Sequence, residues 1–171
     1  DWEGYMAFPY SEDTKDIRGV ISPAVAENIG LTQGYLSNAL ALTKDTYLEY
    51  RNITVPAIFT LSFKLKIKLP ESDENRSDVE GINLVRIAND LDQYIRLVVR
   101  DNALICQCSD GNDITVDFKH ATDLDFVTIA IIQNESERIL YFYSDYVNFE
   151  SYKVIQAKPI GEFNKYYINK K

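Results

Sequence analysis

Apolar and polar residues alternate without interruption along residues 59–69. Aromatic or aliphatic side chains occupy every odd position of this stretch, and Thr, Ser or Lys occupies every even one. Because successive side chains of a strand point to opposite faces, the pattern predicts a long strand over residues 58–69 with one buried and one solvated face. Strands of parallel sheets are usually buried on both faces, so the pattern favours an antiparallel sheet.

Short apolar segments continue from here to the end of the chain. Turn sequences separate them about every eight to twelve residues, as at residues 89–92 and 109–113, which is typical of a sandwich, jelly roll or barrel. The fold class predicted is therefore all-β. The strands expected after residue 34 cover 38–42, 47–50, 58–69, 82–88, 94–100, 103–108, 114–118, 126–133, 138–144, 148–155 and 166–168.

Residues 1–33 differ from the rest and are expected to form an N-terminal arm that packs on a sandwich domain of residues 34–171. The arm carries aromatic side chains at Trp2, Tyr5, Phe8 and Tyr10. Within it, residues 22–30 offer a serine N-cap, a proline at the first helical position and a closing glycine, which together predict a short helix. We therefore expect a short segment that is irregular or partly helical.

The chain has 171 residues and a formal net charge of −8, which suits a single acidic globular domain. A negative surface repels phosphate backbones and anionic lipid, so nucleic acid is not an expected partner. The longest apolar run, residues 126–132, is far shorter than the ~20 residues that a membrane helix needs, so no membrane insertion is expected. Because residue 1 is Asp rather than Met, we expect a processed product or a piece of a longer chain.

Cys106 and Cys108 are two residues apart in a predicted strand and therefore share a face. Their side chains point in parallel, which is a poor geometry for a disulfide. We predict two free cysteines that act as small buried apolar residues.

Catalytic chemistry finds little support. His120 is the only histidine, and no Ser/His/Asp arrangement accompanies it. Glycosidases of sandwich folds need two carboxylates that flank the scissile bond. The nearest acidic string, residues 71–74, has the wrong spacing and lies in a polar loop. We predict that the protein is not an enzyme.

Residues 109–113 hold the strongest metal-ligating candidates. Asp110, Asn112 and Asp113 offer oxygen ligands of the kind that calcium prefers. The segment lacks the full spacing of a calcium loop and its downstream glutamate. A hairpin turn favours the same residue types, because Gly, Asn and Asp suit the backbone conformations of turns. We favour the turn and expect no cofactor, with calcium as the alternative.

Four outward-facing side chains are candidate ligand contacts. In residues 138–144, Leu140 and Phe142 can face the core, which turns Tyr141 and Tyr143 outward. The same alternation turns Tyr94 and Arg96 outward in residues 94–100. If the two strands are neighbours, tyrosine rings for stacking and a guanidinium for planar hydrogen bonds would share one face. Outward aromatic residues are common in β-sheets and need not bind a ligand. The arm or another subunit could cover these side chains, or they could pair with each other between strands.

Three blocks resemble the laminin-G-like, concanavalin-type jelly roll. Residues 34–50 contain a Gly-Tyr start, an Asn-Ala-Leu run, a turn and an aromatic strand, and residues 59–63 read Phe-Thr-Leu-Ser-Phe. Residues 126–145 are similar to the family's closing hairpin, with Phe126 near the family's tryptophan position. The resemblance implies two stacked antiparallel sheets and sugar binding on a concave face or at rim loops, sometimes with calcium. No site residue of the family carries over to this sequence.

The leading functional hypothesis is a non-catalytic carbohydrate-binding or adhesion module on a secreted or surface-displayed protein, with a glycan or a partner protein as its ligand. The alternative is a structural or assembly subunit of a phage virion, such as a fibre, capsid decoration or appendage, that forms homo-oligomers through the aromatic arm. A glycoside hydrolase has the least support. The expected location is extracellular, at a cell surface or on a virion surface.

Overall fold

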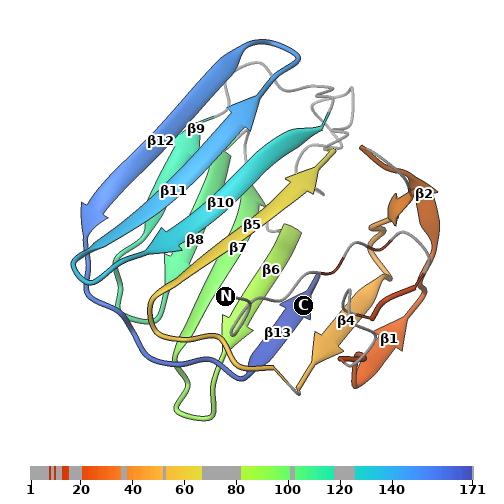
Figure 1. Cartoon of the computed structure of the whole chain (residues 1–171), viewed down its shortest axis with the longest axis horizontal. Helices are drawn as coiled ribbons and strands as arrows, with labels where there is room; N and C mark the ends of the chain where they lie inside the picture. Colours follow the sequence, from red (N-terminus) through yellow and green to blue (C-terminus); the bar gives the residue numbers. More distant parts are fainter. Residues whose placement is uncertain are drawn as a thin grey trace, which may run out of the picture.

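The computed structural model describes residues 8, 10, 13–15, 21–35, 38–51, 53–66, 82–100, 103–117 and 126–170. Within these residues the chain forms thirteen strands and no helix, and every strand pair is antiparallel (Figure 1). No segment in this part of the chain is a helix long and apolar enough to cross a membrane. The predicted all-β, antiparallel sandwich is confirmed.

Two sheets stack to form the sandwich. We call the wider one the large sheet, and its seven strands follow the order β1-β4-β13-β6-β7-β8-β9. The strand bounds are β1 (Val25–Glu27), β4 (Tyr47–Tyr50), β13 (Lys165–Ile168), β6 (Ile82–Ala88), β7 (Tyr94–Arg100), β8 (Ala103–Cys108) and β9 (Ile114–Asp117).

The second layer, the small sheet, has four strands in the order β12-β11-β10-β5. Their bounds are β12 (Phe149–Gln156), β11 (Glu137–Ser144), β10 (Val127–Gln133) and β5 (Phe59–Leu65). A separate hairpin pairs β2 (Leu31–Gln33) with β3 (Asn38–Leu40). In Figure 1 the small sheet overlaps β7 to β9, whereas β4 and β1 project beyond its β5 edge.

Alternation places the core between the sheets. Along β5 the even positions are exposed and the odd ones are turned inward, as the sequence pattern predicted. Leu97 of β7 and Leu140 of β11 are both fully buried, and they lie in one cluster that both sheets contribute to. Cys106 and Cys108 are free and buried, as predicted, with their sulfur atoms 3.8 Å apart. Most predicted strands are found with ends that agree closely, although β5 ends at Leu65 and residues 67–69 lie outside the described part.

The predicted helix at residues 22–30 is wrong. Residues of this segment form β1, which pairs with β4 in the register Val25 to Glu49. The amide of Ala24 also donates a hydrogen bond to the Glu49 carbonyl (2.7 Å). Helix-capping residues indicate only local preference. Here the backbone of the segment forms hydrogen bonds with the edge of the large sheet at β4, and this pairing outweighs the local preference for a helix.

Two aromatic residues of the arm pack where the small sheet leaves the large sheet uncovered. Phe8 lies 4.6 Å from the buried Tyr50 ring, centroid to centroid. The Tyr10 hydroxyl lies 3.1 Å from that of Tyr50, which donates its own hydrogen to the Thr14 carbonyl (2.6 Å). Burial raises the pKa of Tyr50 to about 12. Phe8 and Tyr10 therefore complete the core of their own chain.

A buried polar cluster joins the two sheets at the other side of the sandwich. Arg138 of β11 is fully buried, and its guanidinium donates to both carboxylate oxygens of Asp110 (3.2 and 2.9 Å) in the β8–β9 turn. Its Nε donates to Gln133 Oε1 (2.7 Å). The Gln133 amide in turn donates to three backbone carbonyls, of Asn134, Glu137 and Ala157. We call Arg138, Gln133 and Asp110 the inter-sheet clamp.

Asp110→Asn is expected to destabilise the fold. The substitution leaves a buried guanidinium without its counter-charge, which costs roughly 2–4 kcal/mol of unfolding free energy. Urea denaturation measures this loss, and Asp117→Asn, an exposed carboxylate at the end of β9, is the control that should change little. Equal stability of the parent and Asp110→Asn would contradict the role of the clamp.

The clamp also predicts a pH dependence. Burial alone would raise the pKa of Asp110, but the Arg138 guanidinium outweighs it and lowers that pKa below its ordinary value. A depressed folded-state pKa gives stability that is present above about pH 4, the ordinary aspartate value, and is lost as the pH falls through the folded pKa. The stability difference between the parent and Asp110→Asn should therefore be constant near neutral pH and shrink below about pH 4. Denaturation curves at stepped pH test this, and a difference that persists unchanged in acid would contradict it.

Candidate functional site

The outer face of the small sheet carries a row of tyrosines. Leu140 and Phe142 point into the core, so the intervening side chains of β11 point away from it. Strand register sets Tyr141 directly beside Tyr152 of β12 and beside Ala130 of β10. Tyr143 lies one pleat further along the same face. The prediction that Leu140 and Phe142 face the core is confirmed.

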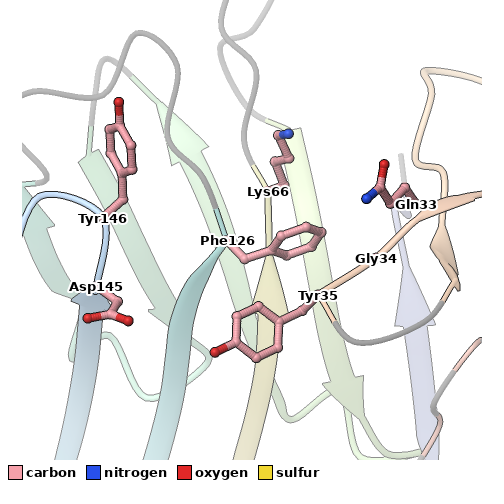
Figure 2. A pocket seen from close by; sticks show the side chains of 7 residues that line it. All are labelled: Gln33, Gly34, Tyr35, Lys66, Phe126, Asp145 and Tyr146. Carbon is pink, nitrogen blue, oxygen red and sulfur yellow. The ribbon is translucent and has the colours of Figure 1, made fainter.

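A hollow of about 550 Å³ lies at one end of this face. Its walls come from the β2–β3 hairpin, the end of β5, the start of β10 and the β11–β12 turn. The lining residues are Gln33, Gly34, Tyr35, Lys66, Phe126, Asp145 and Tyr146 (Figure 2).

Aromatic rings form one wall of the hollow. Tyr35 and Phe126 meet edge to face, with ring centroids 6.0 Å apart. The Lys64 ammonium lies 4.7 Å from the Tyr35 ring centroid and donates to the Thr128 hydroxyl (2.6 Å). These contacts anchor Tyr35 to the small sheet and leave much of its ring open to solvent, because 55% of Tyr35 is exposed.

A hydrogen bond connects the hollow to the tyrosine row. The Tyr143 hydroxyl donates to Asp145 Oδ1 (3.2 Å) at the start of the β11–β12 turn. This bond is the main cause of the raised pKa of Tyr143, and the negative charge of Asp145 adds to it. The row and the hollow therefore form one continuous surface.

We call this region the aromatic surface. It consists of Tyr35, Phe126, Tyr141, Tyr143, Tyr146 and Tyr152. Tyr146 and Tyr152 are 71% and 63% exposed, so their rings are accessible to a ligand. Aromatic faces accept flat apolar surfaces, while Asp145 can accept hydrogen bonds and Gln33 and Lys66 can donate them. The surface suits a ligand that combines apolar faces with hydroxyl edges.

The structure does not bring the four candidate ligand contacts together. β7 belongs to the large sheet and β11 to the small one, so the condition that their strands are neighbours is not met. Tyr141 and Tyr143 join the aromatic surface, whereas Tyr94 and Arg96 lie on the outer face of the large sheet, on the opposite side of the sandwich. Alternation within a strand identifies which side chains point outward, but it does not say which sheet the strand joins.

The two carboxylates among the candidate metal ligands of the β8–β9 turn, Asp110 and Asp113, already have protein partners. Asp110 accepts hydrogen bonds from Arg138 and from the Asn112 amide (3.0 Å). Asp113 accepts one from the Cys108 amide (3.2 Å). Gly111 has φ +81°, the left-handed conformation that a tight turn requires of its glycine. Among the described residues no group of three or more His, Cys, Asp or Glu side chains is placed to hold a metal ion.

Several lining residues were not singled out from the sequence. Tyr35 lies in residues 34–50, the block that resembles the start of a jelly roll. Asp145 and Tyr146 lie in the β11–β12 turn. No local sequence signal indicates that these two segments line the same hollow. His120 and the acidic string at residues 71–74 lie outside the described residues.

Solved structures share this fold. The botulinum neurotoxin type G receptor-binding domain superposes with a TM-score of 0.63 at 10% identity over 96% of this chain, which spans 41% of that domain's length. Domain 4 of AbnA, a GH43 extracellular arabinanase from Geobacillus stearothermophilus solved with arabinotriose, gives 0.63 at 13% identity, covering 95% of this chain and 82% of that one. Winged bean acidic lectin complexed with methyl-α-D-galactose gives 0.52 at 8% identity, covering 87% and 82%.

The fold is thus a lectin-like β-sandwich. At these identities the similarity concerns the fold alone. No family model and no curated protein matches the sequence.

Calcium is expected to leave the stability of the protein unchanged. A ligand that binds only the folded state raises the melting temperature, and the turn carboxylates are already occupied by protein donors. Thermal melts with millimolar calcium and with a chelator should coincide. A calcium-dependent rise that Asp113→Asn abolishes would contradict this expectation and restore the calcium alternative.

Proposed function

We propose that this protein is a non-catalytic carbohydrate-binding module and that the aromatic surface binds the glycan. The observation that carries the proposal is the hollow of about 550 Å³, which is lined by the exposed Tyr35 and Tyr146 together with Asp145, Gln33 and Lys66. Sugar rings have apolar faces that stack on aromatic rings and hydroxyl edges that exchange hydrogen bonds with such side chains.

The tyrosine row extends the proposed site along the small sheet. Tyr143, Tyr141 and Tyr152 continue from the hollow across β11 to β12. A surface of this kind, open along its length, suits several consecutive units of an oligosaccharide better than the end of a chain. The polar groups of the hollow are of mixed charge, which suits neutral sugars.

Solved structures with the same fold support the proposal, although the proposal rests on the hollow itself. Domain 4 of AbnA was solved with arabinotriose and the winged bean lectin with methyl-α-D-galactose, so this fold accommodates sugars in other proteins. We further propose the laminin-G-like branch of the fold, because residues 34–50 and 59–63 supply β3, β4 and β5 as that resemblance implies. A secreted or surface-displayed location follows from the same proposal.

A virion assembly subunit has less support than a binding module. Its motivation was an arm of exposed aromatic residues, and two of these, Phe8 and Tyr10, pack against Tyr50 of their own chain. Docking of the arm on a partner would have to use other residues.

A glycan array followed by calorimetry tests the proposal. With the oligosaccharide that the array selects, Tyr35→Ala and Tyr146→Ala should each weaken binding by about tenfold or more, the typical loss for an aromatic anchor. Leu91→Ala is the matched control, because Leu91 is 77% exposed in the β6–β7 turn, away from the aromatic surface. Absence of binding to any glycan, or equal losses in all three variants, would contradict the proposal.

A further inference from the structure

Two arginines lie directly opposite each other on the outer face of the large sheet. Arg86 of β6 and Arg96 of β7 are cross-strand partners, and Gln107 of β8 continues the same row. Side chains that are paired in this way extend from backbones about 5 Å apart on one face. Like charges in this arrangement destabilise a sheet unless something neutralises them.

Within the described residues, nothing neutralises this pair. Arg96 Nε donates to the uncharged Gln107 Oε1 (2.7 Å), and the Arg86 guanidinium lies 4.5 Å from the Tyr94 ring centroid. Neither arginine forms an ion pair with a described carboxylate. The Nε of Arg86 is buried and has no hydrogen-bond partner.

The composition of the chain makes this arrangement unexpected. Acidic residues outnumber basic ones, 26 to 18, so carboxylates are plentiful. The carboxylate nearest along the same row is Glu49, which Tyr167 separates from Arg86. Glu49 already accepts hydrogen bonds from the Tyr47 hydroxyl (2.9 Å) and from Arg51. Among the described residues, the terminal guanidinium nitrogens of Arg86 and Arg96 therefore have no carboxylate partner, and both side chains are only half-buried.

We propose that Arg86 and Arg96 form a second ligand site, which binds the carboxylate of an acidic sugar such as a uronic acid. Adjacent guanidinium groups match the two oxygens of a carboxylate, and the side-chain amide of Gln107 and the Tyr94 hydroxyl can reach neighbouring hydroxyls. A net charge of −8 opposes a densely charged polyanion at long range, so the site suits an isolated carboxylate. That the carboxylate belongs to a glycan rests on the proposed function, whereas the anion site itself does not.

Nitrogen-15 NMR of the arginine side chains tests the site on the full chain. Digalacturonate should shift the Nε–Hε signals of Arg86 and Arg96, and neutral galactobiose at the same concentration should not. Arg86→Gln and Arg96→Gln should each weaken digalacturonate binding by about tenfold or more, as loss of a charged hydrogen-bonding partner does. Arg100→Gln is the matched control, because it removes the same charge from the same face of β7 and should change binding less than about twofold.

Absence of shifts at both arginines would overturn the site, as would an equal loss of binding in Arg100→Gln, which would indicate general electrostatics. Tyr35→Ala separates this site from the aromatic surface, because it should leave the digalacturonate shifts intact even if the proposed function fails. Without ligand, Arg96→Gln should melt no lower than the parent, since it relieves a like-charge pair. A clearly lower melting temperature would assign the pair a structural role instead and would contradict the proposal.

Discussion

The two sheets can pack only because every second residue of their strands is apolar, and this constraint decides where everything else in the molecule can lie. Side chains of one parity, such as Leu97 and Leu140, meet between the sheets and exclude water. Side chains of the other parity form two outer faces on opposite sides of the sandwich. Any ligand contact carried by a strand must therefore lie on one of these faces, and residues on different sheets cannot share a site across the core.

The large sheet is wider than the small sheet. Different contacts stabilise the two sides of the sandwich. Beyond the β5 edge, Phe8 and Tyr10 cover the inner side of β4 and β13, which the small sheet does not reach. On the other side the inter-sheet clamp fixes the β8–β9 turn against β11. Part of the aromatic surface depends on this arrangement, because Tyr141 and Tyr143 belong to β11, the strand whose Arg138 binds the β8–β9 turn of the large sheet.

Local pattern was enough to predict most strands, because alternation along a strand reflects burial of that same strand. It predicted the outward direction of Tyr141 and Tyr143 for the same reason. A short stretch of sequence does not indicate which distant segment it will pair with. The sequence therefore suggested a helix where β1 pairs with β4. It also suggested that β7 and β11 could be neighbours, although they belong to different sheets. The hollow could not be predicted either, since Tyr35 and Tyr146 line it together only after the hairpin and the β11–β12 turn are in place.

A crystal structure of the chain with an oligosaccharide selected on a glycan array would show whether the aromatic surface binds a glycan. We expect a sugar ring stacked on Tyr35 or Tyr146, with its hydroxyls within hydrogen-bonding distance of Asp145, and further units along β11 toward Tyr141. An oligosaccharide bound at the rim near Leu91, or anywhere else with the hollow left free of sugar, would contradict it.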